Sequence, residues 1–213
     1  MLSPEYRLDG RGLRRDERRE AAELACRSFD DGPYFRYVLP DQRQRARAVR
    51  IIHHTLFAHP GRGSRIRTVR DSRDRIVGLS LWLPTGHYPL STTNQLVQLP
   101  GALRSCSYRP SVMRTGIAYA RATEPLHPKE PHWYLSVLMA DPAIQGRGVG
   151  TALMDEALVI VDHERVGAYL ETNNESNVDY YAKFGFQVRA TLRPLPDAPP
   201  RFTLWRNPVP PKE

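Results

Sequence analysis

The chain has 213 residues, of which 40% are hydrophobic and 25% charged. This length predicts one domain with a sizeable core, and the composition excludes a disordered chain, which would be poorer in apolar residues. No apolar run approaches the roughly 18 residues that cross a bilayer, and the charged first twenty residues contain no apolar signal segment. We therefore expect a cytoplasmic protein without a membrane partner.

The formal net charge of +8 comes almost wholly from arginine, because the chain contains only three lysines. The planar guanidinium suits phosphate, so the charge favours anionic partners such as polyphosphate ligands or nucleic acid. A bias in genomic base composition would produce the same arginine excess. Cys26 and Cys106 lack the spacing of a zinc site or a disulfide framework. We predict reduced thiols and no metal site.

The N-terminal half begins with two predicted amphipathic helices. Apolar residues recur at helical spacing over 14–29 and again over 41–57, where Asp41 can cap the helix. The sequence Asp30-Asp31-Gly32-Pro33 ends the first pattern, which predicts a loop between the helices. Arginines crowd the start of the first helix, but acidic residues alternate with them, which favours a solvated face over a nucleic-acid interface.

The rest of the chain has the alternating pattern of helices and strands that predicts an α/β fold. β-branched residues predict a hairpin of strands 65–69 and 76–83, and Pro100, Gly101, Pro110 and Gly116 break the following segment into short helices. An apolar run bounded by prolines predicts a central buried strand at 133–140. The remaining predicted elements are a helix at 151–163, a strand at 166–170, a helix at 174–184, strands at 186–192 and 202–205, and a Pro-rich tail at 207–213.

A glycine-rich turn joins the central strand to the helix that follows it. Gly146, Gly148 and Gly150 let a ligand approach the backbone, and the N–H groups of the helix start form an anion site that fits a pyrophosphate. Arg147 adds a charged contact. A tight turn alone would need fewer glycines, and a P-loop would need a following GK[ST]. A dinucleotide fold is disfavoured because Thr151 replaces its third glycine and only 42 residues follow Glu171.

Two motifs together carry a family resemblance. Gln145-x-x-Gly148-x-Gly150 resembles the central signature of the GNAT superfamily of acetyl-CoA-dependent N-acetyltransferases, and residues 174–186 resemble its downstream tyrosine element. Residues 127–135, Leu170-Glu171-Thr172 and Asn177-Val178 look most like the puromycin N-acetyltransferase branch. The resemblance is strong over about 127–205 and weak before it.

The resemblance implies a single GNAT domain over 1–213, with a mixed sheet of about six or seven strands flanked by helices. It also implies that strands 133–140 and 166–171 splay apart to hold acetyl-CoA. The implied cofactor-binding residues lie on the splayed strand, on the turn and on the last helix: Leu138, Met139, Ala140, Gln145, Gly146, Arg147, Gly148, Val149, Gly150, Thr151, Asn174, Asn177 and Tyr181. One of the two asparagines need not touch the cofactor, since Asn174 also suits helix capping.

The same resemblance implies direct attack by an amine in a ternary complex, without a covalent intermediate. Tyr181 matches the family tyrosine that protonates the departing thiolate, although its ring would also suit core packing. Glu171, at a strand end, is our candidate general base, and a solvated carboxylate is the alternative. Asp30, Tyr34, Trp82 and Tyr134 are candidates for the acceptor site, by position only.

We therefore expect acetyl transfer to a primary amine of a small molecule. One candidate acceptor is an antibiotic or xenobiotic such as an aminonucleoside, and acetylation of such a compound would make the protein a resistance enzyme. The alternatives are a GNAT-fold protein acetyltransferase and a non-catalytic basic module that regulates or binds nucleic acid. The sequence is compatible with a monomer or a homodimer.

Overall fold

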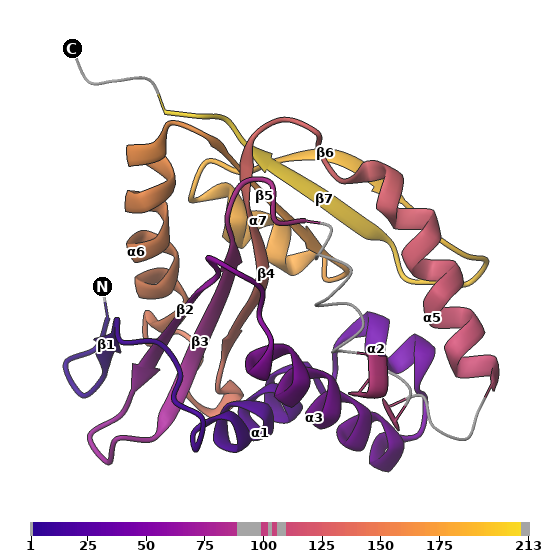
Figure 1. The fold of residues 1–213 in the computed structure, drawn as a ribbon, viewed down its shortest axis with the longest axis horizontal. Helices are drawn as coiled ribbons and strands as arrows, with labels where there is room; N and C mark the ends of the chain where they lie inside the picture. The colour runs from indigo at the N-terminus through magenta and orange to yellow at the C-terminus, as the bar shows by residue number, and fades with distance from the viewer. Residues whose placement is uncertain (1, 89–98, 102–103, 106–109, 210–213) are drawn as a thin grey trace.

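The computed structural model describes residues 2–88, 99–101, 104–105 and 110–209. One seven-stranded sheet runs through the molecule in the order β1-β2-β3-β4-β5-β7-β6 (Figure 1). Only β4 and β5 pair in parallel, and β4 is central, as the sequence predicts. The strands are β1 (Arg7–Asp9), β2 (Arg65–Arg70), β3 (Ile76–Leu83), β4 (His132–Ala140), β5 (Gly167–Thr172), β6 (Gln187–Leu192) and β7 (Arg201–Arg206).

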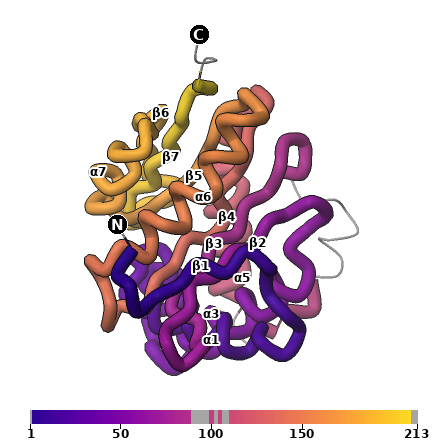
Figure 2. Tube along the Cα trace, turned by 90° about the vertical axis from the view of Figure 1, so that its left-hand side faces the viewer, coloured from indigo at the N-terminus to yellow at the C-terminus, as the bar shows by residue number. Residues whose placement is uncertain are grey.

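Helices cover both faces of this sheet (Figure 2). On one face, α1 (Arg18–Phe29) and α3 (Gln42–Ala58) pack against β3 and the end of β4 through Leu24, Val49 and Val137. On the other face, α6 (Val149–Glu164) and α7 (Ser176–Ala182) pack on β4, β5 and β7. Asp41 caps α3 as expected, because its carboxylate accepts a hydrogen bond from the Gln44 N–H at 2.8 Å. Two apolar cores, one on each face, therefore hold the sheet.

Helix α5 (Pro110–Thr123) and the short 3₁₀ turn η1 (Glu124–Leu126) precede β4 in the chain. The Tyr119 ring of α5 packs edge-on against Tyr34, with centroids 4.7 Å apart, and also lies under the Arg201 guanidinium of β7. The sequence predicts that Gly116 interrupts this segment, and this is wrong. Gly116 lies inside the helix, since a glycine costs a helix only about 1 kcal/mol.

Two further elements differ from the sequence prediction. The predicted loop after α1 contains α2 (Pro33–Val38), where Pro33 occupies the first turn and its fixed φ suits a helix start. Strand β1 has no prediction at all, because three residues carry too little pattern. Cys106 and the end of the predicted Pro-rich tail lie outside the described residues, whereas Cys26 is a half-buried free thiol whose pKa is raised by burial.

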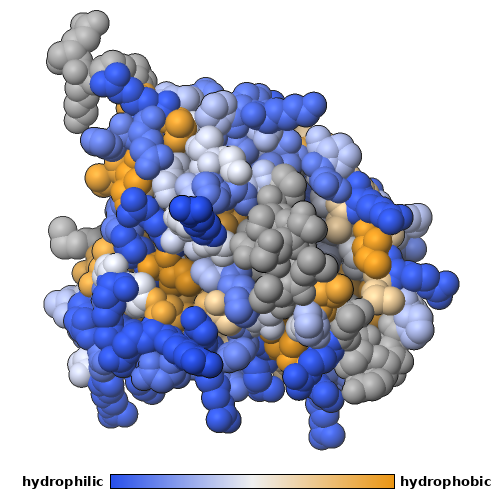
Figure 3. All heavy atoms as spheres, in the orientation of Figure 1, coloured by the Kyte–Doolittle hydropathy of each residue, from blue (hydrophilic) through white to orange (hydrophobic). Residues whose placement is uncertain are grey.

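A buried ion-pair network anchors β1 and α1 to the sheet. The Arg70 guanidinium is almost fully buried and donates to Asp9 at 2.9 Å and to Glu17 at 2.8 Å. Arg11 bonds to the same two carboxylates. Much of the arginine near the chain start is thus neutralised internally, while Arg43 and Arg47 of α3 are exposed. The lower edge of the molecule in Figure 3 is hydrophilic.

Candidate active site

Strands β4 and β5 separate half-way along their length. They pair from His132–Gly167 to Leu135–Leu170 and no further, although β4 continues against β3 to Ala140 and β5 continues against β7 to Thr172. The separation begins at a β-bulge, because Val137 pairs with Leu81 and Leu135 pairs with Trp82, which leaves Ser136 extra. A bulge bends its strand. The predicted splay is confirmed, and it leaves the β5-facing edge of residues 136–140 without a strand partner.

The glycine-rich turn lies directly after this split strand. The 3₁₀ turn η2 (Pro142–Ile144) leads into Gly146 and Gly148, whose φ angles of 83° and 79° are left-handed and favour glycine. Gly148 precedes the first residue of α6 and has no side chain to bond to the helix N–H groups. Those N–H groups therefore remain available to an anion.

Of the remaining turn residues, some are exposed and others pack against β3 and α7. Gln145 and Arg147 are exposed, and the Arg147 carbonyl accepts the Ser3 N–H at 3.1 Å. The Val149 side chain is buried against β3, so that only its backbone faces the turn. Gly150 is required by packing, because a Cβ there would lie 2.6 Å from the Tyr180 hydroxyl of α7.

Tyr181 lies on the α6 and α7 side of the split. Its ring packs against Phe186, with centroids 6.0 Å apart, in the core cluster that also contains Leu135 and Leu170. Burial raises the pKa of its phenol, which keeps the hydroxyl protonated.

The two asparagines beside Tyr181 fasten α7 to the end of β5. The Asn174 side-chain oxygen accepts the N–H of Ser176, the first residue of α7, at 3.2 Å. The Asn177 amide donates to the Thr172 hydroxyl at 3.3 Å. Both side chains therefore lie next to the split.

Glu171 lies on the opposite face of the sheet from Tyr181. Its carboxylate is almost buried and forms an ion pair with Arg201. It also accepts hydrogen bonds from the Tyr169 hydroxyl at 2.8 Å and from the Tyr134 hydroxyl at 3.5 Å. Burial and the Glu171 charge both raise the pKa values of these two tyrosines. The split thus separates a buried phenol on one face from a tyrosine-lined carboxylate on the other.

Comparison with known proteins agrees with this geometry. Residues 106–186 match the model of the Acetyltransferase (GNAT) family. The chain is similar to a crystal structure described as histone acetyltransferase HPA2 and related acetyltransferase, from Corynebacterium glutamicum. The alignment covers 98% of this chain and 99% of that one, with 19% sequence identity and a TM-score of 0.72. The chain has the GNAT fold.

Two other solved structures align over nearly the whole chain. Arylalkylamine N-acetyltransferase 2 from Aedes aegypti has 7% identity and a TM-score of 0.63, covering 95% of this chain and 98% of that one. The PaiA N-acetyltransferase from Thermoplasma acidophilum, solved in complex with coenzyme A, has 12% identity and a TM-score of 0.58 at the same coverages. At these identities the similarity shows the GNAT fold alone.

The four candidate acceptor residues lie in three different places. Tyr34 and Tyr134 lie on the Glu171 side of the GNAT sheet, where Tyr119 links Tyr34 to Arg201. The Asp30 carboxylate instead accepts from Gln42 at 2.9 Å and pairs with Arg45, and so it fastens α1 to α3.

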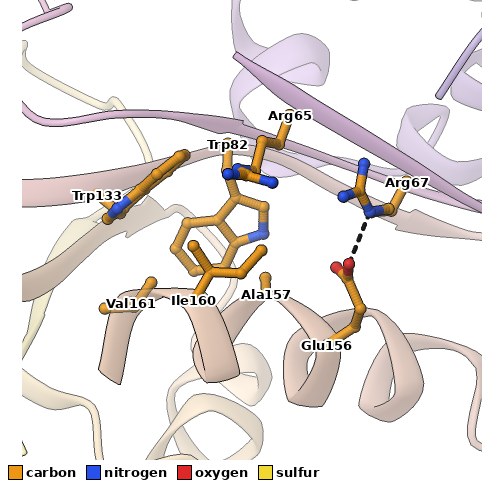
Figure 4. A pocket seen from close by; sticks show the side chains of 8 residues that line it. All are labelled: Arg65, Arg67, Trp82, Trp133, Glu156, Ala157, Ile160 and Val161. Carbon is orange, nitrogen blue, oxygen red and sulfur yellow. Dashed lines mark hydrogen bonds and ion pairs between the residues drawn. The ribbon is translucent and has the colours of Figure 1, made fainter. Parts of the chain in front are cut away.

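Trp82 lies away from this site altogether. It is 1% exposed and packs on the α6 side of the sheet, beside a hollow of about 10 Å³ lined by Arg65, Trp133 and Ile160 (Figure 4). Its indole N–H has no partner among the described residues, and the hollow is about the size of one water molecule. The structure does not bring Trp82 to Glu171, because β3 alternation turns it to the opposite face.

Sequence reasoning misses several residues of the Glu171 side. Tyr169 lies two positions before Glu171 on β5, so strand alternation is a signal that places it on the same face. Arg201, Tyr119 and Asn173 reach the site from three separate segments, and no motif in the sequence connects them. Within the described ranges, no cluster of metal-ligating side chains is present and no helix is long and apolar enough to span a membrane.

Proposed function

We propose that this protein transfers the acetyl group of acetyl-CoA to a primary amine of a small molecule. The observation that carries the proposal is the split between β4 and β5, which adjoins a glycine-lined helix start and has Tyr181 and Glu171 on its two faces. The unpaired strand edge suits the amides of a pantetheine arm, and the helix start suits a pyrophosphate. These features fit acetyl-CoA, which supplies the acetyl group as a thioester.

The candidate cofactor residues other than Asn174 each have a proposed task in this arrangement. The backbone of Leu138 and Ala140 pairs with the pantetheine arm, and an N–H of Met139 or Ala140 bonds to the thioester oxygen. The backbone from Gly146 to Thr151 holds the pyrophosphate, with the exposed Gln145 and Arg147 at its edge. Asn177 borders the arm at the end of β5.

We assign the proton transfers to the two faces of the split. Tyr181 gives its phenolic proton to the departing thiolate from the α6 and α7 side, because burial keeps the phenol protonated. Glu171 draws the acceptor's ammonium to the other face and takes up its proton. Tyr34 and Tyr134 border that acceptor, which gives the amine an aromatic entrance. A ternary complex follows, since acceptor and cofactor occupy different faces.

The acceptor we propose is an amine that carries an aromatic or heteroaromatic group, such as an aminonucleoside antibiotic. The support is the tyrosine-rich Glu171 face, together with the Leu170-Glu171-Thr172 and 127–135 segments that resemble the puromycin N-acetyltransferase branch. Acetylation of such an amine would remove its charge and inactivate a toxic compound. We propose that the protein acts in the cytoplasm on this class of molecule.

Acetyl-CoA titration and a thiol-release assay test the proposal. We expect micromolar or tighter binding of acetyl-CoA by calorimetry, and thiol release with puromycin above that with polyamines or a histone peptide. Gly148→Val should abolish the binding, because a branched side chain disfavours the left-handed φ of 79° at the helix start. Gly12→Val is the matched control, since Gly12 has a φ of 81° but lies in the loop after β1. Absence of acetyl-CoA binding to the wild-type protein would refute the function.

A further inference from the structure

Arg201 joins three elements at the Glu171 face. It begins β7 and forms its ion pair with Glu171 of β5. Its Nη1 donates to the Asn173 side-chain oxygen at 3.2 Å, and its guanidinium lies 5.5 Å from the centroid of the Tyr119 ring of α5. Asn173 in turn donates to the Tyr119 hydroxyl and to the Pro200 carbonyl. The guanidinium is therefore fixed in place by its surroundings.

The positive charge of this guanidinium is paired with the Glu171 carboxylate. Burial opposes the charged form, but Glu171 raises the pKa of Arg201, so that the arginine stays charged. Its Nε–H is buried and has no partner in the described part of the chain. The ion pair with Glu171 is the one charged contact that this guanidinium makes among the described residues.

We infer that Arg201 is a positioning residue for Glu171: it holds the carboxylate as an oriented anion that receives the acceptor's ammonium. The inference rests on the proposed function. The groups that face this carboxylate are Tyr134 on β4, Tyr169 on β5 and Arg201 on β7, with Tyr119 of α5 and Tyr88 after β3 close by. Arg201 is the positively charged group among these five. Its removal leaves phenols, which do not replace its charge.

The test is the pH dependence of kcat/KM for the amine in Arg201→Met. Removal of a positive charge beside a base moves the acid limb of kcat/KM to higher pH, and for a charge in direct contact we expect a movement of about one unit or more. At a pH below the limb, this lowers kcat/KM about tenfold, while acetyl-CoA affinity stays unchanged. Arg201→Lys restores the charge and should return the limb toward its wild-type position.

Arg206→Met is the matched control on the same strand. Arg206 is also a half-buried arginine of β7 in an ion pair, but its partner is Asp162 of α6, and it bonds to the Phe184 carbonyl at 2.8 Å. We expect a lower melting temperature and an unmoved acid limb. If Arg201→Met does not fold, Arg201→Lys is measured in the wild-type protein and in the Glu171→Gln variant. Any effect of Arg201→Lys on kcat/KM should disappear in the Glu171→Gln variant, because residue 171 is already neutral there.

The outcomes separate the inference from the function on which it rests. An active wild-type enzyme whose acid limb is the same in Arg201→Met, or moves equally in Arg206→Met, overturns the role of Arg201 alone. The same holds if Arg201→Lys and Glu171→Gln have additive effects. A wild-type protein that neither binds acetyl-CoA nor acetylates any amine refutes both.

Discussion

The hydroxyl of Tyr181 is the side-chain group whose removal best separates binding from chemistry. Tyr181→Phe keeps the ring that packs on Phe186 and removes only the proton proposed for the thiolate. Loss of a general acid costs about 10²- to 10⁴-fold in rate. We expect single-turnover rates to fall by that factor, with acetyl-CoA affinity almost unchanged.

The neighbouring tyrosine provides the control for this experiment. Tyr180 is half-buried, its pKa is raised by burial to about 12, and its hydroxyl faces Gly150. Tyr180→Phe should retain wild-type single-turnover rates. If Tyr181→Phe does the same, Tyr181 is a packing residue and another group protonates the thiolate.

At the scale of elements, the contact between α6 and α7 depends on one close approach. A Cβ at Gly150 would lie 2.6 Å from the Tyr180 hydroxyl oxygen and 3.4 Å from the ring carbon that bears it. Gly150→Ala should therefore destabilise the protein by about 1 to 3 kcal/mol through overpacking. Urea unfolding measures the effect.

A second substitution shows whether that hydroxyl is the cause. In the Tyr180→Phe background the oxygen is absent and only the ordinary 3.4 Å contact remains, so Gly150→Ala should cost little or even stabilise α6 by helix propensity. Equal destabilisation in both backgrounds would show that the strain arises elsewhere in the turn.

At the scale of the whole molecule, a buried histidine links stability to pH. His53 of α3 is 5% exposed, stacks on Phe29 and donates through Nδ1 to the Val49 carbonyl at 2.8 Å. Burial lowers its pKa from 6.5 to about 4. Between these values the unfolded chain binds the proton and the folded chain does not, so the free energy of unfolding falls as pH drops from 6.5 to 4, by about 3 kcal/mol.

Replacing this histidine should remove that part of the pH dependence. We expect His53→Leu to flatten the slope of unfolding free energy between pH 6.5 and 4.5, measured in urea at several pH values. His54→Leu is the control, because His54 is the exposed neighbour on the same helix. A slope that stays the same in His53→Leu would assign the acid sensitivity to other groups. His127 is the next candidate, since burial and His132 lower its pKa to about 3.

The sequence alone determined the features that depend on local spacing. The Gln145-x-x-Gly148-x-Gly150 turn predicts the helix start where α6 begins, and the apolar run 133–140 predicts the central strand, because both signals lie within ten residues. The helix at 151–163 and the hairpin of 65–69 and 76–83 are confirmed for the same reason. Local pattern is weaker where an element is short, which explains why β1 and α2 have no prediction.

Only the tertiary structure decided which side chains meet around the split. Trp82 and Tyr134 are both aromatic strand residues, yet β3 alternation turns Trp82 toward α6 while Tyr134 faces Glu171. Arg201 is thirty residues from Glu171 in sequence and pairs with it because β7 inserts between β5 and β6. The extra residue Ser136 marks where the strands separate. Faces, sheet order and bulges depend on contacts between distant segments, and no spacing within one segment encodes them.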